Sequence, residues 1–469
     1  MTTLKRKGQR FCPTLRDRKK RWEVKININH QADDTAERAV LVGVEVKGSR
    51  PLFSVDDSLD ELALLADTAG VTVCGRMSQK VGHIDPGTFI GSGKLEEMVT
   101  LLGELNANIV IFDDELSPRH QREIQKALGD KVHVLDRSAL ILDIFAQHAH
   151  TREGSLQVEL AQYEYRLPRL TRQWTHLARQ AGGGAGRGGT GGVGLRGPGE
   201  TQLEVDRREI DRKITRLKKE LEAVRAHRQR HRLQRLRAGV PTVALVGYTN
   251  AGKSTLLNAL SGADVYVANQ LFATLDPTTR RVTLPNGRAV LFSDTVGFIQ
   301  KLPVTLVAAF RATLEEVTDA DLLLHVVDGS HPRAWDHVDV VEDTLAELGA
   351  ERLPKILVLN KNDRPASSEI LDYANLGYRA MVPVSALRKT GLEQLLETIG
   401  QILVDNLVTV SITIPYTQGE WLAMIHNQGI VVEEKHGDVG VDLVVRVPPR
   451  LAGQLEQIVK GASEEEEES

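Results

Sequence analysis

The sequence predicts a multidomain α/β protein: an α/β subdomain, a long antiparallel helical hairpin, a second α/β domain with a parallel-type sheet, and a small α/β domain. Three observations predict this fold. Short β-branched runs such as "RAVLVGVEV" and "NIVIFDD" alternate with helical stretches before residue 150, which is typical of a parallel sheet covered by helices. Apolar residues then recur at spacings of four and three, the pattern of paired helices. A strand, a glycine-containing loop and a helix follow near residue 247 and open the second α/β domain.

The helical pattern is divided by a glycine-rich loop. Leu156, Leu160 and Tyr163 carry the apolar seam before the loop, and a similar heptad resumes at Leu203. Two heptad segments joined by one loop pair with each other or with a second chain; a hairpin within a monomer is the simpler solution, and the oligomeric state stays open. We expect six parts: a basic arm (1–36), an N-terminal α/β subdomain (37–150), a helical hairpin (151–238) with its glycine-rich loop at 182–199, the second α/β domain (239–405), a small C-terminal α/β domain (406–460) and an acidic tail (461–469).

Composition excludes several classes of protein. No apolar run approaches the length of about 18 residues that a transmembrane helix needs. The basic arm lacks the apolar core of a secretory signal. Cys12 and Cys74 are too few for a disulfide framework. We therefore expect a cytoplasmic protein. Peripheral binding of a fraction of the molecules to a membrane is left as an open alternative.

Charge is unevenly distributed along the chain. The formal net charge is −4, yet the segment 203–237 holds 13 Lys or Arg residues against six Asp or Glu residues. Such a segment suits a polyanionic partner met by one surface of the protein. A solvated helix face is the alternative interpretation.

The strongest single motif is "VALVGYTNAGKST". A β-branched strand, Val243–Val246, leads into Gly247 and then into Gly252, Lys253 and Ser254, the strand–loop–helix order of the P-loop. The glycines let backbone N–H groups face phosphate oxygens, Lys253 supplies a charge to the β- and γ-phosphates, and Ser254 offers a hydroxyl to Mg²⁺. The residues between the glycines complete the candidate loop: Tyr248, Thr249, Asn250 and Ala251.

A second stretch, "DPGTFIGSGKLEEM", matches this motif less well. Thr88 stands where the first glycine belongs, and Leu95 follows Lys94 where a metal-binding hydroxyl belongs. The stretch retains an anion-binding helix N-terminus as an open alternative. The departures argue against a second nucleotide site.

Three shorter motifs follow in the order that a guanine-nucleotide site requires. Asp363, at the end of "KILVLNKND", can accept hydrogen bonds from both guanine N1–H and the exocyclic amine, which adenine does not offer. In "VLFSDTVGF", we expect Asp294 to be directed toward Mg²⁺ and the Gly297 N–H toward the γ-phosphate. In the third motif, "SAL", backbone N–H groups are expected to donate to guanine O6. The candidates are Asp294, Thr295, Val296, Gly297, Asn360, Lys361, Asn362, Asp363, Ser385, Ala386 and Leu387. The sequence therefore predicts binding of GTP and GDP and Mg²⁺-dependent hydrolysis of GTP.

Two residues bear on the mechanism. Phe298 follows Gly297 where Ras-like enzymes carry a water-orienting glutamine, which predicts slow intrinsic turnover that accelerates on docking to a macromolecule. Asn250 offers an amide oxygen that suits a K⁺ ion beside the α- and β-phosphates. Hydrogen bonding within the loop is the alternative role for Asn250.

These motifs together resemble the HflX GTPases of the translation-factor-related class. The resemblance covers residues 37–405 and rests on "GTFIGSGKLEE", "GPGETQLEVDRR", "GYTNAGKSTLLN", "LFATLDPTTRR", "DTVGFIQKLP", "LVAAFRATLEE" and "NKND". It implies that switch I comprises Phe272, Ala273, Thr274, Leu275 and Asp276. Thr274 is then expected to reach Mg²⁺ together with Ser254, and Lys253, Thr274 and Gly297 form the expected catalytic set.

The resemblance also implies a partner, the large ribosomal subunit with its rRNA, and a role in ribosome rescue, splitting or subunit homeostasis under stress. ATP binding by the N-terminal region is implied for some members. A GTP-regulated protein scaffold and a factor that remodels free RNA stay as alternatives. The glycine-rich loop is expected at the hairpin tip, where Arg187 and Arg196 are available for phosphate contacts. A passive linker is the other interpretation of this loop.

Overall fold

The computed structural model describes most of the chain. The described residues are 37–48, 52–170, 198–238, 240–262, 271–272, 274–301, 311–365, 377–416, 419–437, 440–448, 451–453 and 455. The expected basic arm and acidic tail, Ala273, and residues 182–197 of the glycine-rich loop lie outside them.

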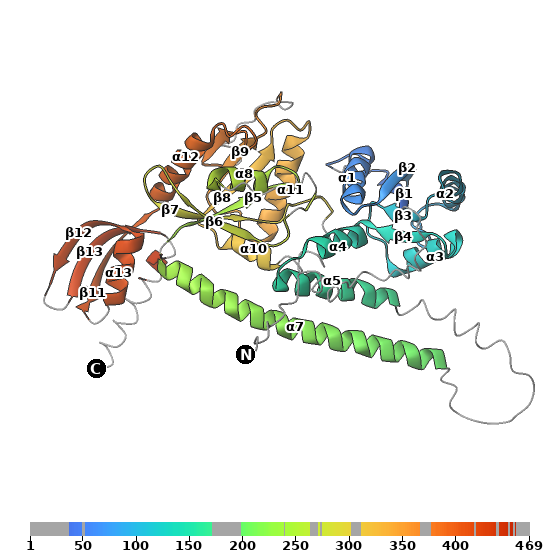
Figure 1. Ribbon diagram of the computed structural model, residues 1–469, viewed down its shortest axis with the longest axis horizontal. Helices are drawn as coiled ribbons and strands as arrows, with labels where there is room; N and C mark the ends of the chain where they lie inside the picture. Colours follow the sequence, from blue (N-terminus) through green and yellow to red (C-terminus); the bar gives the residue numbers. More distant parts are fainter. Residues whose placement is uncertain are drawn as a thin grey trace, which may run out of the picture.

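A four-stranded parallel sheet forms the N-terminal α/β unit (Figure 1). Its strands, in the order β2-β1-β3-β4, are β1 (Arg38–Val46), β2 (Thr72–Val81), β3 (Ile109–Phe112) and β4 (His133–Asp136). The helices are α1 (Val55–Thr68), α2 (Ser92–Leu105), α3 (Pro118–Leu128) and α4 (Arg137–His148). Successive side chains of a strand face opposite sides: Leu41 packs with α1 and α4, whereas Val40 and Val42 pack with α2 and α3. Helices therefore cover both faces of the sheet.

Side-chain caps fix where several of these helices begin. Ser54 and Asp57 form a capping box at the start of α1, each side chain accepting a hydrogen bond from the other's backbone N–H. Ser117 caps α3 just before Pro118, and Asp136 caps α4. These side chains satisfy backbone N–H groups in the first turns of the three helices.

Two long helices form the expected antiparallel hairpin. They are α5 (Arg152–Leu170) and α7 (Pro198–Ala238), which lie side by side in Figure 1. Glu153 pairs with Arg228 at 3.0 Å and Glu164 with Lys218 at 2.9 Å. The earlier residue of α5 thus pairs with the later residue of α7, and the later residue of α5 with the earlier one. The two helices therefore run in opposite directions. α7 has 41 residues and a length of about 60 Å.

The third unit contains a six-stranded sheet in which only β6, among the described strands, runs antiparallel to its neighbour. The strands, in the order β10-β9-β8-β5-β7-β6, are β5 (Thr242–Val246), β6 (Thr278–Thr283), β7 (Ala289–Asp294), β8 (Leu322–Asp328), β9 (Lys355–Asn360) and β10 (Ala380–Pro383). Its helices include α8 (Lys253–Ser261), α10 (Arg311–Thr318), α11 (Ala334–Glu347) and α12 (Leu392–Asp405). This parallel-type sheet with covering helices is the predicted nucleotide-binding architecture.

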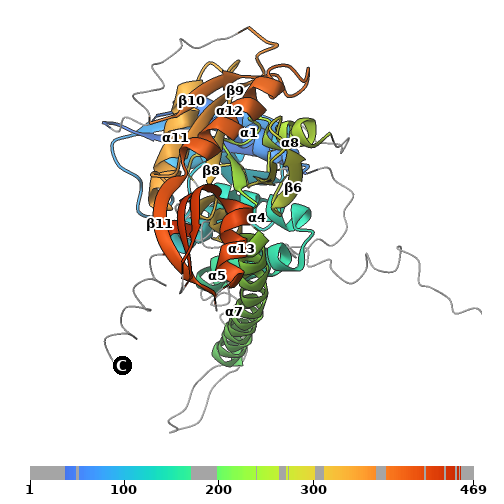
Figure 2. The same cartoon turned by 90° about the vertical axis from the view of Figure 1, so that its left-hand side faces the viewer.

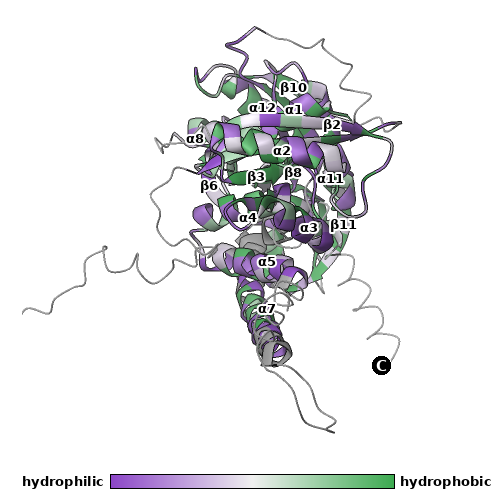
Figure 3. Cartoon of the chain, turned by 90° about the vertical axis from the view of Figure 1, so that its right-hand side faces the viewer, coloured by the Kyte–Doolittle hydropathy of each residue, from purple (hydrophilic) through white to green (hydrophobic). Residues whose placement is uncertain are grey.

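A small sheet lies beyond α12. Its antiparallel strands, in the order β11-β13-β12, are β11 (Val408–Pro415), β12 (Ile430–His436) and β13 (Gly440–Val447), and α13 (Gly419–Gln428) packs on them. The end-on view in Figure 2 places this unit at one end of α7, which α13 contacts. In Figure 3, β3 and β8 are hydrophobic and α3 at the surface is hydrophilic, as burial requires. Among the described residues, no helix combines the length and apolarity that a membrane span requires.

Candidate nucleotide-binding site

The P-loop connects the end of β5 to the start of α8. Gly247 has a φ of 151°, and a Cβ added there would lie 2.2 Å from the carbonyl oxygen of Val326 on β8. Gly252 has a φ of 93°, and its Cβ would lie 2.3 Å from Nδ2 of Asn360. Both the backbone conformation and the space require glycine at the two ends of this loop.

Lys253 is buried at the start of α8. Its Nζ donates to the carbonyl oxygens of Gly247 at 3.0 Å and Tyr248 at 2.9 Å. Burial lowers the pKa of Lys253 to about 8, although Asp294 acts to raise it. The ammonium group therefore lies inside the curve of the loop, where phosphate oxygens would stabilise its charge.

We expect guanine-nucleotide binding to take up a proton above pH 8. Phosphate oxygens favour the charged form of Lys253, so they raise its pKa again from about 8. The affinity for GDP should then be constant below the pKa of Lys253 in the nucleotide-free protein. Above that pKa it should fall about tenfold per pH unit. The nucleotide-free protein should become more stable over the same interval, because the unfolded chain, with the higher Lys pKa, binds more protons. Calorimetry of GDP binding in buffers of different ionisation enthalpy measures the uptake; an affinity unchanged one unit above the pKa would contradict it.

Three oxygen-bearing side chains meet beside Lys253. Ser254 Oγ lies 2.7 Å from Thr274 Oγ1 and donates to Asp294 Oδ2 at 2.6 Å. Asp294 Oδ1 is buried and has no hydrogen-bond partner among the described residues. Two hydroxyls and a carboxylate are the hard oxygen donors that Mg²⁺ prefers. The residues present therefore fit a magnesium ion.

The loop after β9 is tied directly to the P-loop. Asn360 Nδ2 donates to the carbonyl oxygen of Ala251 at 2.9 Å, and Lys361 Nζ donates to that of Asn250 at 3.0 Å. Lys361 also pairs with Asp328 at 2.7 Å. Asp328 was not among the sequence candidates, although its position directly after the hydrophobic run "LLLHVV" was a usable signal. These contacts hold the two loops together as one wall of the site.

Asp363 and Ser385 lie together on the guanine side. Ser385 Oγ donates to Asp363 Oδ1 at 2.5 Å, and this hydrogen bond holds the pKa of Asp363 below its usual value. The carboxylate is therefore ionised at neutral pH and able to accept two hydrogen bonds. The Ala386 N–H donates to Asn360 Oδ1 at 3.0 Å, so it already has a partner within the protein. The exposed members of this group are Asn362, Asp363 and Leu387.

Several candidates turn their side chains into the protein. Thr295 Oγ1 donates to the carbonyl oxygen of Leu245 at 2.6 Å, and Val296 is a core residue. These side chains are engaged within the protein, so the prediction that the residues bind the nucleotide concerns their backbone groups and stays a prediction. The candidates so placed are Tyr248, Phe272, Leu275, Asp276, Thr295 and Val296.

Residues 297–301, which we call switch II, are fixed to the P-loop. A Cβ at Gly297 would lie 2.9 Å from Thr249 Cα and 3.1 Å from Lys253 Nζ. The Thr249 N–H donates to the Phe298 carbonyl oxygen at 2.8 Å, and the Phe298 N–H donates to Gly247 at 3.1 Å. The Phe298 side chain is buried, so neither its chemistry nor its position allows it to orient a water molecule.

The second glycine-rich stretch closes on itself. Asp85 Oδ1 accepts hydrogen bonds from the Gly87 and Thr88 N–H groups, each at 2.8 Å. Lys94 pairs with Glu97 at 2.7 Å. Asp85 thus closes the turn before α2, whereas the N-terminus of α2 at Gly91 has no side-chain cap, so an anion at this helix end stays a prediction.

A network that the sequence did not predict joins the N-terminal unit to the nucleotide site. Tyr248 Oη donates to Glu61, and Glu61 pairs with Arg137, whose side chain is 1% exposed. Arg137 also pairs with Asp113 at 2.7 Å, and Asp113 pairs with Lys301 of switch II. The chain of charges thus starts at the P-loop, passes through the N-terminal core and returns to switch II.

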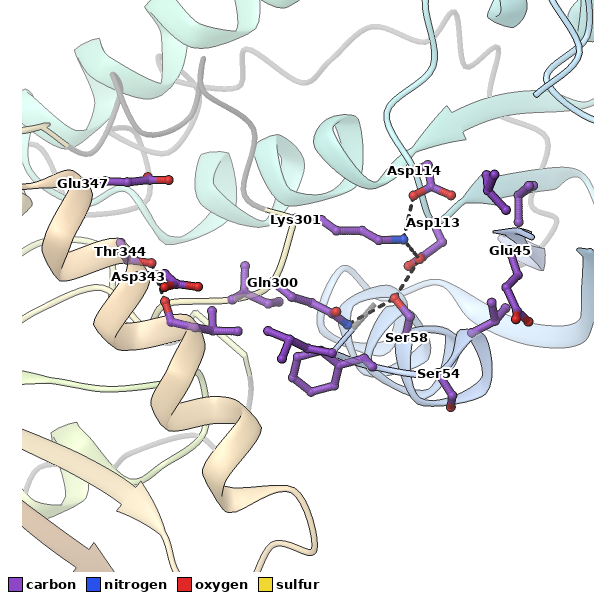
Figure 4. Close-up of a pocket in the computed structure, with 17 residues that line it drawn as sticks. Glu45, Ser54, Ser58, Asp113, Asp114, Gln300, Lys301, Asp343, Thr344 and Glu347 are labelled. Atoms are coloured by element: carbon purple, nitrogen blue, oxygen red, sulfur yellow. Dashed lines mark hydrogen bonds and ion pairs between the residues drawn. The ribbon is translucent and has the colours of Figure 1, made fainter. Parts of the chain in front are cut away.

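Figure 4 shows where this network meets solvent. Lys301 points to Asp113 and Asp114, and the Gln300 amide donates to Ser58 Oγ at 3.1 Å. These residues line a cavity of about 540 Å³ between the N-terminal unit and α11. Switch II therefore contributes to the contact between the two units, together with Arg333, which pairs with Asp57, and Phe53, which stacks on Tyr248.

Known proteins match the chain in four consecutive regions. Residues 56–146 match the family described as GTP-binding GTPase N-terminal, 148–235 the GTP-binding GTPase Middle Region, 242–361 the 50S ribosome-binding GTPase, and 373–469 the HflX C-terminal domain. "GTPase HflX" of Caldanaerobacter subterraneus subsp. tengcongensis is 45% identical over 90% of this chain and 94% of its own length. The chain belongs to the HflX family of GTPases.

Other HflX relatives match over similar lengths. "GTPase HflX" of Escherichia coli strain K12 is 41% identical over 88% of this chain and 94% of its own. A solved GTP-binding protein of Sulfolobus solfataricus in complex with GDP is 25% identical and covers 79% of this chain and 99% of its own, with a TM-score of 0.41. The predicted family is confirmed, and this HflX GTPase is a GTP-hydrolysing enzyme.

Proposed function

We propose that this HflX GTPase acts on the large ribosomal subunit in the cytoplasm, in ribosome rescue, splitting or subunit homeostasis under stress. The observation that carries the proposal is the basic surface of α7, a helix attached through α5 to the switch I side of the nucleotide site. Exposed cations on this helix include Arg207, Arg208, Arg212, Lys213, Arg216, Lys218 and Lys219. A rod with such a surface suits rRNA phosphates. The description of the family that matches residues 242–361, a 50S ribosome-binding GTPase, supports the same partner.

The proposed chemistry is electrostatic. Lys253 stabilises charge on the β- and γ-phosphates, and the Gly297 N–H donates to the γ-phosphate. Ser254 and Thr274 would hold Mg²⁺, with Asp294 beside them, and the bound ion would supply positive charge next to the phosphate oxygens. On the base side, the Asp363 carboxylate selects guanine.

Two further proposals concern the placement of the attacking water and a monovalent cation. We propose that a docked partner completes the placement of the attacking water, so that turnover is slow in the isolated protein. We also propose that the Asn250 amide helps to hold K⁺ near the α- and β-phosphates. Equal hydrolysis rates in K⁺ and Na⁺ buffers would remove the K⁺ proposal.

Co-sedimentation with purified large subunits tests the function. We expect binding with a non-hydrolysable GTP analogue, weaker binding with GDP, and a rise in kcat when subunits are added. Deleting residues 183–194 should leave GTP hydrolysis by the isolated protein intact and remove the action on ribosomes. Binding that ignores the nucleotide would favour a protein scaffold, and binding only to free RNA would favour an RNA-remodelling factor.

A further inference from the structure

Switch I is packed against the helical hairpin as well as the nucleotide site. Its described residues, Phe272 and Thr274–Asp276, include two core side chains, Phe272 and Leu275, and Leu271 just before them is a third core residue. Phe272 meets Phe145 of α4 edge-on, with 4.6 Å between ring centroids. The apolar side of switch I is therefore buried against the helix that leads into α5.

The polar side of switch I ends at the N-terminus of α5. Asp276 Oδ2 accepts hydrogen bonds from the backbone N–H groups of His150 at 2.8 Å and Thr151 at 2.7 Å, and Oδ1 accepts one from the Thr151 hydroxyl. Thr151 Oγ1 in turn accepts from the Gly154 N–H at 3.0 Å. Asp276 thus completes the cap of α5, placing a carboxylate where the helix dipole favours it. We call these four residues the Asp276 clasp.

The clasp lies two residues from the metal-site hydroxyl. Thr274 Oγ1 is 2.7 Å from Ser254 Oγ, while Asp276 is held by α5. A segment this short cannot keep Thr274 in place if Asp276 moves several ångströms, because adjacent Cα atoms are a fixed distance of about 3.8 Å apart. The position of α5 therefore bears directly on the position of Thr274.

We propose that Asp276 is a positioning residue for GTP hydrolysis: the α5 N-terminus holds it and thereby holds Thr274 at the metal site. The inference rests on the proposed role of Thr274 in holding Mg²⁺. Because α5 pairs with α7, displacement of the hairpin by a bound partner changes the Mg²⁺ site, and the nucleotide state changes the hairpin by the same coupling free energy. The clasp links the proposed RNA-binding rod to hydrolysis.

Gly154 allows a test from the hairpin side that leaves switch I unchanged. A Cβ at Gly154 would lie 2.3 Å from Asp276 Oδ1 and 3.2 Å from Thr151 Oγ1. Gly154→Ala should therefore open the clasp, and because Ala favours helix by about 1 kcal/mol over Gly, α5 itself is not weakened. We expect kcat to fall about tenfold and the KM for GTP to stay within about twofold. The Mg²⁺ requirement should rise, both as the concentration for half-maximal rate and as weaker Mg²⁺ binding, measured by calorimetry without turnover, to the protein loaded with a non-hydrolysable GTP analogue. Ser155→Ala, which removes a hydroxyl of the same turn bonded to the Thr151 carbonyl, is the matched control.

A double variant separates the clasp from general damage. Asp276→Ala should lower kcat like Gly154→Ala, and combining the two should add nothing, because the new methyl then meets no carboxylate. Multiplied losses, or an unchanged Mg²⁺ requirement in Gly154→Ala, would overturn the proposal. Thr274→Ala tests the underlying role separately: if it changes neither kcat nor the Mg²⁺ requirement, the assignment of Thr274 fails. If Thr274→Ala is impaired and the clasp variants are not, only the clasp fails.

Discussion

Asp363→Asn is expected to weaken GTP binding about 10³-fold and to improve binding of xanthosine triphosphate. The carboxylate of Asp363 is held ionised by Ser385, so it can accept from both guanine N1–H and the exocyclic amine. An amide presents a donor to that amine and leaves a hydrogen bond of the bound base unmade. Xanthine carries an oxygen in place of the amine, which the amide of the variant would satisfy. Fluorescent-nucleotide titrations of both triphosphates measure the change.

The controls for this variant lie nearby. Asp405→Asn makes the same chemical change at an exposed position at the end of α12 and should alter neither affinity. Ser385→Ala removes only the group that orients Asp363, so its loss of GTP affinity should be smaller. Equal weakening for GTP and xanthosine triphosphate in Asp363→Asn would mean that the residue supports the loop and does not read the base.

The parts of the site that could be predicted from sequence are local. The P-loop needs glycines at Gly247 and Gly252 for reasons visible within one strand, loop and helix, and Asp363 follows its strand directly. Backbone geometry imposes these spacings, so the sequence retains them. The alternation of strands and helices likewise predicted both α/β units, and the heptad spacing of apolar residues predicted the hairpin.

What sequence reasoning missed depends on distant residues. Tyr248 was assigned to the nucleotide because of its place in the P-loop, but its hydroxyl contacts Glu61, 187 residues away. Lys301 and Asp113 are separated by 188 residues. Asp276 was expected at the nucleotide as part of switch I, which stays a prediction, and its contact with the α5 N-terminus was not foreseen. No periodicity or motif within one chain segment predicts such contacts, because they arise only when two folded units meet.

Ion pairs of Asp113 connect switch II to the N-terminal unit. Burial raises the pKa of Asp113, but Arg137 and Lys301 outweigh burial and hold that pKa below its usual value. Asp113 is therefore charged at neutral pH and is balanced by one cation from each unit. If the two units separate, Asp113 keeps Arg137 and loses Lys301, so switch II loses its anchor without a collapse of the N-terminal core.

Arg137→Met is expected to destabilise the N-terminal unit by about 3–5 kcal/mol, since it leaves the buried Asp113 and the partly buried Glu61 without their shared cation. Glu61 and Asp113 both pair with this guanidinium, which is 1% exposed. Adding Glu61→Gln and Asp113→Asn should restore much of the loss by removing the unpaired charges. Arg76→Met breaks a solvent-exposed pair with Asp60 and should cost at most about 1 kcal/mol.

Urea unfolding across a range of pH tests this account. The lowered pKa of Asp113 means that its contribution to stability is present above the carboxyl pKa of the unfolded chain and is lost as the pH falls through the lower folded-state pKa. The difference between the native protein and Arg137→Met should therefore shrink in acid, where the Asp113 carboxylate becomes neutral. A difference that persisted at low pH would instead mean that Arg137 stabilises the core through packing of its aliphatic stem.

Because Tyr248 and Lys301 lie at the two ends of the network, Arg137→Met should also loosen switch II. Faster hydrogen exchange at Gln300 and Lys301 would measure this loosening.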